Sequence, residues 1–437
     1  MTHPLRNPTT DKAPFPRPDL ALAERLFQEL GQRTAAVEGV TRASYGAGEN
    51  LAHQIAAREA RRIGMVVETD AALNLYMTLP GSTRSPRLII GSHLDSVPCG
   101  GNFDGAAGVL AGLAVAAGVA EAGVPLKHDL TVMAIRAEES TWFNASYVGS
   151  RAAFGLLKPC ELDQVVRADD GMTLAAHIAA AGGDVAALRS GRAFLSRATV
   201  AAFVEPHIEQ GPELIDRDRP IGVVTGIRGS FRHRQAVCLG AYAHSGATPR
   251  RLRRDAVMAT AALAGALDRL WSRRLKAGDD LAITIGQFTT DPREHAFSKV
   301  AGRVDFALDF RSQSTQTLAA IRRDLARIAR RVEQSHGAAF RFGPLTDSAP
   351  APMDADIVAG LRRAASAAGY DAPPLPSGAG HDAAVFAGQG VPTGMLFIRN
   401  ANGSHNPAEA MTMEDFSIAA DTLMRFCLGR CGAAHDG

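Results

Sequence analysis

The chain contains five potential metal ligands in the order histidine, aspartate, glutamate, histidine, histidine, namely His93, Asp104, Glu139, His207 and His405. A second carboxylate, Glu138, directly precedes the glutamate of this series. His93 and Asp104 are eleven residues apart, so one short segment offers both an imidazole nitrogen and a carboxylate oxygen. Zinc, cobalt and manganese all bind such mixed donors. The series therefore predicts a hydrolase that holds two metal ions.

Most of these ligands follow apolar segments that predict buried strands. The segments are 88–90 before His93, 130–135 before Glu138 and Glu139, 200–204 before His207, and 393–398 before His405. In open α/β sheets, ligand sites lie at the carboxyl ends of the strands. Four separate strand ends that carry donors therefore predict one shared site at one edge of a sheet.

Eight motifs, spread over most of the chain, carry a family resemblance. They are Gly91-Ser-His-Leu-Asp-Ser-Val-Pro98, Gly101-Asn-Phe-Asp-Gly105, Glu138-Glu139, His207-Ile-Glu-Gln-Gly-Pro212, Gly226-Ile-Arg-Gly-Ser230, His244-Ser-Gly-Ala-Thr-Pro249, Ser377-Gly-Ala-Gly-His-Asp-Ala383 and Ser404-His-Asn-Pro407. Together they resemble the M20 metallohydrolase superfamily, in its hydantoinase/carbamoylase branch. The fourth and seventh motifs are similar to the enzymes acting on N-carbamoyl amino acids, allantoate and β-ureido acids rather than to the peptidases.

The resemblance implies a role for each ligand. Asp104 would bridge two divalent ions (zinc, manganese, cobalt or nickel), with His93 and His207 completing one centre and Glu139 and His405 the other. Two ions about 3.5–4 Å apart can share a water and lower its pKa. Glu138 lies beside a ligand and is the expected general base. Asp95, two residues past His93, is expected to accept the imidazole N–H and orient the ring.

The resemblance also implies substrate contacts. His244 would donate a hydrogen bond to the carbonyl oxygen as negative charge develops there. Arg311 would hold the substrate carboxylate in two parallel hydrogen bonds. Gln210 and His381 are expected in the pocket. Two departures from the family pattern occur: Trp142 stands where many relatives have arginine, and His295 or Ser298 would replace an asparagine contact. We expect both to alter the pocket.

The length of 437 residues predicts two domains. The resemblance implies a mixed-sheet α/β catalytic domain of aminopeptidase/phosphorylase-like type, residues 1–227 plus 347–437, with an inserted α+β lid and dimerisation domain, residues 228–346. Within the insert, the pattern predicts strands at 231–239, 281–289 and 302–311 and helices at 255–277 and 315–335. Such an arrangement favours two helices on an antiparallel sheet and, by resemblance, a homodimer.

Composition excludes several other classes. The formal net charge is +2 and aromatic residues make up 6%, so no nucleic-acid partner is expected. The small-apolar run 105–120 predicts a buried helix, too short for a membrane span. Residues 1–18 lack the apolar core of a signal peptide, and five scattered cysteines favour reduced thiols, which together predict a cytoplasmic protein. Among the cysteines, Cys99 is expected to be a small buried thiol.

The predicted reaction is hydrolysis of the ureido (N-carbamoyl) C–N bond of an N-carbamoyl-L-amino acid or a related ureido acid, which gives amine, carbon dioxide and ammonia. Two enzyme alternatives are allantoate amidohydrolase and an M20 aminoacylase or dipeptidase acting on amide bonds. Gln210 and His381 argue against the acylase and dipeptidase alternative. A dimeric scaffold without activity is the remaining alternative, and the presence of all five ligands with Glu138 argues against it.

Overall fold

The computed structural model describes residues 15–432, so most of the segment 1–18, from which the absence of a signal peptide is inferred, lies outside the described residues. The described chain forms two compact units. Unit 1 contains the residues up to 223 together with 356–373 and 389–432, and unit 2 contains 224–355 and 374–388. The ranges inferred from sequence assign 374–388 to the catalytic domain, whereas these residues belong to unit 2.

Unit 1 is built on a mixed sheet. Its strands lie in the order β1 (Val66–Thr69), β2 (Leu75–Leu79), β4 (His128–Ile135), β3 (Thr83–His93), β5 (Val200–Ile208), β16 (Thr393–Ile398) and β6 (Ile221–Ile227). The pairs β1–β2 and β2–β4 are antiparallel, whereas β4, β3, β5 and β16 are parallel neighbours. The last six residues of β3, from Leu88 to His93, and every residue of β16 are buried, as expected for central parallel strands. This sheet confirms the predicted fold class.

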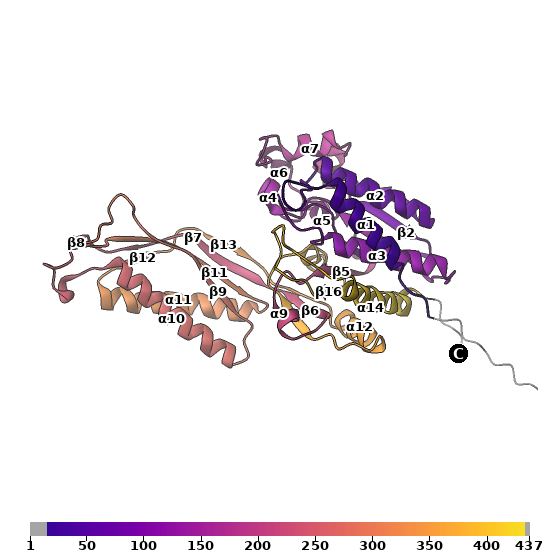
Figure 1. Cartoon of the computed structure of the whole chain (residues 1–437). Helices are drawn as coiled ribbons and strands as arrows, with labels where there is room; N and C mark the ends of the chain where they lie inside the picture. Colours follow the sequence, from indigo (N-terminus) through magenta and orange to yellow (C-terminus); the bar gives the residue numbers. More distant parts are fainter. Residues whose placement is uncertain (1–14, 433–437) are drawn as a thin grey trace, which may run out of the picture. The chain divides into compact units, whose positions relative to one another are not determined.

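Helices bury the sheet of unit 1. The longer ones are α1 (Leu20–Arg33), α2 (Ala47–Ile63), α3 (Ala106–Glu121), α12 (Ala355–Ala367) and α14 (Met413–Cys431). As predicted, α3 is a buried helix: its residues from Ala106 to Val119 are buried, and it contacts β3, β4 and β5 as well as α1, α2 and α14 (Figure 1). Alanine and glycine allow this close approach, because a methyl group at Gly108 would collide with the backbone carbonyl of Pro206 on β5.

A group of short helices follows β4. These are α4 (Ser140–Phe143), α5 (Val148–Ala153), α6 (Pro159–Gln164), α7 (Leu174–Ala180) and α8 (Val185–Arg189), and the later α9 (Glu213–Asp216) follows β5. Helices α4 to α8 share a separate apolar cluster that includes Phe143, Val148, Leu162 and Ile178. The turn that leaves β4 therefore has its own apolar support.

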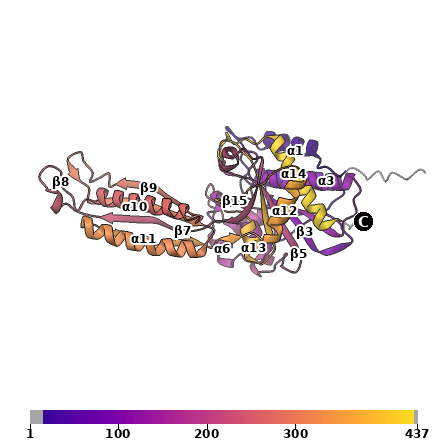
Figure 2. The same cartoon turned by 90° about the horizontal axis from the view of Figure 1, so that it is seen from below.

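Unit 2 is an antiparallel sheet with two long helices on one face (Figure 2). Its strands are β7 (Gly229–Leu239), β9 (Ala282–Thr290), β11 (Arg303–Ser312), β12 (Ala339–Arg341) and β13 (Leu345–Ser348), and its helices are α10 (Ala256–Lys276) and α11 (Thr315–His336). Asp255 and Ser314 cap these helices by accepting backbone N–H groups of the first turn. The predicted α+β composition of the insert is thus confirmed.

Strand β11 shows why the sequence forms this sheet. Val304, Phe306, Leu308 and Phe310 alternate with polar residues and are all buried against α10 and α11. The smaller elements of the unit are β8 (Ala243–His244), the 3-10 helix η1 (Arg250–Leu252), β10 (Lys299–Val300), β14 (Ala351–Pro352), β15 (Pro374–Ser377) and α13 (Ala383–Gly388). Strand β14 pairs with the end of β6, where Ala351 lies opposite Ile227.

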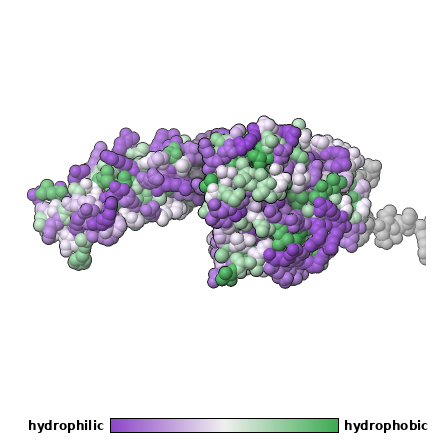
Figure 3. Space-filling model, turned by 90° about the horizontal axis from the view of Figure 1, so that it is seen from above, coloured by the Kyte–Doolittle hydropathy of each residue, from purple (hydrophilic) through white to green (hydrophobic). Residues whose placement is uncertain are grey.

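Hydrophobic residues gather mainly inside the units. On the face drawn in Figure 3, hydrophobic side chains form only scattered groups between hydrophilic ones. Among the described residues, no helix combines the length and the apolar character needed to cross a membrane.

Candidate functional site

The predicted ligands of unit 1 come together at the carboxyl ends of its parallel strands. His93 is the last residue of β3 and lies opposite Ile135, the last residue of β4. On β5, His207 lies opposite Phe397 of β16. Because parallel strands end at the same edge, the four strand exits inferred from sequence reach one place. Asp104 joins them from the loop directly before α3.

Two groups of three side chains result, and they share Asp104. Donor atoms of His93, Asp104 and His207 lie within 4.8 Å of one another, and so do those of Asp104, Glu139 and His405. His207 Nε2 is 3.1 Å from Asp104 Oδ1, and His405 Nε2 is 3.3 Å from Asp104 Oδ2. His405 Nε2 is also 3.3 Å from Glu139 Oε1. One carboxylate therefore faces both groups with a different oxygen.

The imidazole rings are oriented through their Nδ1 atoms. His207 Nδ1 lies 2.9 Å from the backbone carbonyl of Ile208, and His93 Nδ1 lies 3.1 Å from the carbonyl of Asp95 and 3.3 Å from its Oδ1. A carbonyl oxygen can only accept, so each Nδ1 carries a proton, and Nε2 is the ring atom that offers a lone pair when the ring is neutral. The two Nε2 atoms are 3.4 Å apart. In the neutral rings these two atoms can therefore serve as ligands of one cation.

The electrostatic field of this group also favours a cation. Burial alone would lower the pKa of His93, but the neighbouring carboxylates, beginning with Asp95, raise it well above its ordinary value. Hydrogen bonds to Asp104 and Glu139 raise the pKa of His405 to about 10. Burial would raise the pKa of Asp104, yet His207 and His405 hold it well below its usual range.

The donor set fits divalent metal ions. Three imidazole nitrogens and two carboxylates are the ligands that zinc, cobalt, nickel and manganese accept. Asp104 Oδ1 is buried and accepts no well-formed hydrogen bond within the part of the chain that the structure describes. A buried carboxylate oxygen without such a donor costs free energy unless a cation neutralises it. His93, His207 and Asp104 would hold one ion, and Glu139, His405 and Asp104 a second.

Glu138 is held beside this cluster by Asp95. The two oxygens of Asp95 each accept a backbone N–H, from Glu138 and from Glu139, both at 3.1 Å. Ser44 Oγ donates to the same carboxylate at 2.6 Å. Glu138 Oε2 reaches to 3.9 Å from His93 Nε2. Asp95 thus contacts both the ring of His93 and the turn that carries the two glutamates.

A buried ion pair that the sequence reasoning missed supports the same turn. Arg136 Nη1 and Glu49 Oε2 are 2.9 Å apart, and Glu49 Oε1 accepts the backbone N–H of Ala137 at 2.8 Å. Ala137 has a φ of 51°, in the left-handed region that side chains rarely adopt. Glu49 lies 88 residues before Ala137, so no local pattern signals the contact. The pair fixes the strained turn from which Glu138 projects.

Gln210, which the sequence predicts to be a pocket residue, lies at the cluster. Its Nε2 donates to Asp104 Oδ2 at 2.9 Å and lies 3.5 Å from His405 Nε2. Gln210 and His405 have φ values of 63° and 60°, so both loops are strained where their side chains meet Asp104. Glu209, by contrast, caps α9 by accepting the backbone N–H groups of Glu213 and Leu214.

Two further residues contact Asp104 and were not predicted from the sequence. Ser404 Oγ lies 2.6 Å from Asp104 Oδ2 and 2.6 Å from Glu409 Oε2. Glu409 is buried and accepts the backbone N–H groups of Phe103 and Asp104. The only sequence signal is the closeness of both residues to His405 in Ser404-His-Asn-Pro-Ala-Glu409.

The other predicted site residues belong to unit 2. Arg311 lies near the end of β11, where its Nε and Nη2 donate to Asp309 Oδ2 at 3.0 and 2.8 Å. Its Nη1 donates to the carbonyl of Gly378 at 2.7 Å. The guanidinium is thereby held in one orientation and keeps further N–H groups on Nη1 and Nη2. His381, from the same loop as Gly378, is buried with its Nε2 3.0 Å from Ser377 Oγ.

His244 lies on the short strand β8, opposite Lys299 of β10. Its Nδ1 accepts the backbone N–H groups of Gly246 at 3.2 Å and Ala247 at 3.1 Å. An Nδ1 that accepts two N–H groups has no proton, so the neutral ring carries its proton on Nε2. His244 is exposed, and its Nε2–H is a hydrogen-bond donor.

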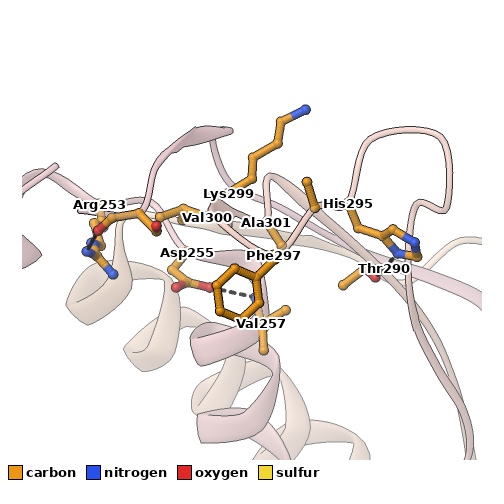
Figure 4. Close-up of a pocket in the computed structure, with 11 residues that line it drawn as sticks. Arg253, Asp255, Val257, Thr290, His295, Phe297, Lys299, Val300 and Ala301 are labelled. Atoms are coloured by element: carbon orange, nitrogen blue, oxygen red, sulfur yellow. Dashed lines mark hydrogen bonds between the residues drawn. The ribbon is translucent and has the colours of Figure 1, made fainter. Parts of the chain in front are cut away.

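His295 lies on the loop before β10. In Figure 4 its ring faces Thr290, and Nδ1 lies 2.9 Å from Thr290 Oγ1. Both residues line an open pocket of about 500 Å³ within unit 2, together with Ser245 and Lys299. Ser298, the other candidate for the missing asparagine, accepts the backbone N–H of Ser245 through its carbonyl.

The structure places Trp142 and Cys99, in the loops around the cluster, differently from what the sequence predicts. Trp142 is only 7% exposed, belongs to the apolar cluster of α4 to α8, and donates its indole N–H to the carbonyl of Ser96 at 2.7 Å. It supports the segment between His93 and Asp104 rather than lining an open space. The expectation that Cys99 is buried is wrong: this residue is exposed and has a φ of 52°. The loop is held here through the backbone, because the N–H of Cys99 donates to Thr41 Oγ1 at 3.0 Å, and the side chain is left exposed.

Comparison with known proteins agrees with this geometry. The model of peptidase family M20/M25/M40 matches residues 89–429. An N-carbamoyl-L-amino acid amidohydrolase from Geobacillus stearothermophilus is 35% identical over 92% of this chain and 96% of its own length. An allantoate amidohydrolase from Escherichia coli (strain K12) is 32% identical over 82% of this chain and 85% of its own. A hydantoinase/carbamoylase family amidase from Burkholderia ambifaria superposes with a TM-score of 0.85 at 31% identity, covering 96% of this chain and 99% of that one. The chain therefore belongs to peptidase family M20/M25/M40, in its hydantoinase/carbamoylase branch.

Proposed function

We propose that this protein is a metal-dependent amidohydrolase that cleaves the ureido C–N bond of an N-carbamoyl-L-amino acid or a related ureido acid. The observation that carries the proposal is the pair of donor groups that share Asp104, with Glu138 beside them. This arrangement occurs in a chain similar over nearly its whole length to an N-carbamoyl-L-amino acid amidohydrolase. The similarity to an allantoate amidohydrolase makes allantoate the second candidate substrate.

Two divalent cations bound by the two donor groups would lower the pKa of a water and polarise the carbamoyl carbonyl. Glu138 would accept the proton of that water, because the hydrogen bonds of Asp95 hold its backbone at the cluster. It would then deliver the proton to the departing nitrogen. Addition of water to the carbamoyl carbon and cleavage of one C–N bond yield an amine and a carbamic acid, which decomposes to carbon dioxide and ammonia.

The residues of unit 2 would recognise the substrate. His244 would donate its Nε2–H to the developing oxyanion, because its Nδ1 is already an acceptor. Arg311 would bind the substrate carboxylate with the N–H groups that Asp309 and Gly378 leave available. His381 and His295 of this unit, with Gln210 of unit 1, would complete the contacts. Asp309 restricts the guanidinium before substrate arrives, which lowers the entropy lost on binding.

Three further parts of the proposal concern the whole protein. The ions would be zinc, manganese, cobalt or nickel, because all accept this donor set. The subunits would form a homodimer through the inserted domain, and the protein would act in the cytoplasm.

The test is a substrate panel with protein reloaded with manganese, cobalt or zinc. It contains N-carbamoyl-L-amino acids, β-ureidopropionate, allantoate, N-acyl amino acids and dipeptides, and both ammonia and free amine are measured. We expect ammonia release in proportion to substrate loss for a ureido acid. Amine release without ammonia would instead assign the protein to the acylases or dipeptidases of the family, and the best ureido substrate would separate the carbamoyl amino acids from allantoate.

A further inference from the structure

Glu409 lies on the loop between β16 and α14, four residues after His405, and no role in the proposed reaction accounts for it. Its side chain is 7% exposed. Burial of a carboxylate costs free energy unless hydrogen bonds compensate for it. The partners of Glu409 therefore indicate what this carboxylate does.

One oxygen of Glu409 holds the segment that carries Asp104. Its Oε1 accepts the backbone N–H of Phe103 at 2.9 Å and that of Asp104 at 3.1 Å. These two N–H groups lie directly before α3, and neither has a partner within its own turn in the described structure. The backbone of Asp104 is thus fixed by a residue that lies 305 positions later in the sequence.

The other oxygen connects Glu409 to both metal-ligand loops. Glu409 Oε2 lies 2.6 Å from Ser404 Oγ, and the same hydroxyl lies 2.6 Å from Asp104 Oδ2. Ser404 directly precedes His405, whose backbone has a strained φ of 60°. Glu409 therefore contacts the backbone of Asp104 directly. Through the hydroxyl of Ser404 it is also linked to the side chain of Asp104 and to the loop that carries His405.

The glycine at position 101 makes room for this contact. A methyl group at Gly101 would collide with the carboxylate of Glu409. The motif Gly101-Asn-Phe-Asp104 thus provides the space for Glu409 as well as the ligand Asp104.

We propose that Glu409 is a positioning residue that holds Asp104 and the His405 loop in the one arrangement that binds both divalent cations. The inference rests on the metal binding of the proposed function but not on its substrate. Removal of a residue that hydrogen-bonds to a metal ligand typically lowers metal affinity by about 10- to 100-fold. The expected loss for Glu409→Ala is of this size.

Asp70 provides a matched control. Its Oδ1 accepts the backbone N–H groups of Ala72 at 2.9 Å and Asn74 at 3.0 Å, and its Oδ2 receives side-chain donors from Asn74 and Tyr76. Like Glu409, it is a buried carboxylate in a loop of unit 1. It contacts none of the metal-ligand residues, so Asp70→Ala should lower stability and leave metal affinity unchanged.

The experiment titrates metal-free protein with Zn²⁺ against a chromophoric chelator and records the visible spectrum of the Co²⁺ form. The thermal stability of each metal-free variant is measured alongside. We expect Glu409→Ala to weaken Zn²⁺ binding by about 10- to 100-fold and to change the Co²⁺ spectrum. Glu409→Gln should stay close to the wild type, because its amide oxygen can accept both N–H groups and its NH₂ can donate to Ser404.

Three outcomes would overturn the inference. Zn²⁺ affinity of Glu409→Ala equal to the wild type, with a loss of stability like that of Asp70→Ala, would make the residue purely structural. Equal losses in Glu409→Gln and Glu409→Ala would assign the effect to charge instead of position. If Glu409→Ala does not fold, Ser404→Ala replaces it, and unchanged Zn²⁺ affinity in that variant would reject the link. A protein that binds Zn²⁺ as expected but hydrolyses no ureido acid would refute the proposed function alone.

Discussion

The Nε2 atoms of the buried His93 and His207 rings lie 3.4 Å apart. The Nδ1 atoms of both rings already face acceptors in the backbone. Neighbouring carboxylates raise the pKa of both rings, so a positive charge is favoured at this point, as a proton or as a metal ion. At this distance both Nε2 atoms can bind one cation.

Replacement of Glu138 by glutamine should separate catalysis from metal binding. The amide keeps the size of the side chain but cannot accept a proton, so we expect kcat to fall by about 10²- to 10⁴-fold. Glu138 is not among the donor groups that share Asp104, so the metal content should equal that of the wild type. Steady-state kinetics and elemental analysis of the same preparation test both parts. Full activity in Glu138→Gln would show that Glu138 is not the general base.

Gly105 and Gly123 flank α3 and form a natural pair for a second prediction. Both have positive φ, 66° and 62°, so alanine at either position is strained, at a cost of about 1–3 kcal/mol of stability. A methyl group at Gly105 would also collide with the ring of His93, whereas at Gly123 no atom lies within 4 Å.

Gly105→Ala should therefore lose metal affinity and activity, and Gly123→Ala only stability. Denaturant unfolding and chelator competition measure the two effects. A Gly105→Ala variant that binds metal as tightly as Gly123→Ala would show that the His93 ring can move without consequence.

Arg311→Lys should weaken substrate binding. Lysine lacks the planar fork of arginine, so at least one charge-assisted hydrogen bond to the substrate carboxylate is lost, at a cost of about 1.5–3 kcal/mol. We expect kcat/KM to fall by about 10- to 100-fold, mostly through KM.

Arg303→Lys is the matched control for this substitution. Arg303 lies on the same strand and pairs with Asp305 two residues away, as Arg311 pairs with Asp309. Equal kinetics in the two variants would contradict the role of Arg311.

His53 predicts a pH dependence of stability that is independent of the metal ligands. It is buried in α2, neither ring nitrogen has a hydrogen-bond partner in the described structure, and burial lowers its pKa well below 6.5. A histidine with a lowered pKa binds its proton more readily in the unfolded chain, so stability falls as pH drops below about 6.5.

The slope from this one group is at most about 1.4 kcal/mol per pH unit. His53→Leu should remove that part of the slope and leave stability near pH 8 little changed. Urea unfolding at pH 5 and pH 8 measures it. An identical pH dependence in both proteins would mean that His53 does not contribute.

Much of the fold was predictable because it is encoded locally. The alternation from Val304 to Phe310 predicted which side of β11 is buried, since side chains of a strand point to opposite faces in turn. The run of alanine and glycine before residue 121 predicted a buried helix, and this too is a pattern within one short segment. The exposure of Cys99 could not be predicted in this way, because whether a loop side chain faces inward depends on the turn and on the segments around it.

By itself the sequence determined the identity and order of the metal-ligand candidates and the strands that carry them, because donor chemistry and strand alternation are properties of single short segments. Only the tertiary structure decided how these donors are held. Glu409 meets Asp104 across 305 positions, and Glu49 meets Ala137 across 88. Which backbone N–H a buried carboxylate accepts depends on the packing of distant segments, and no local periodicity records that choice.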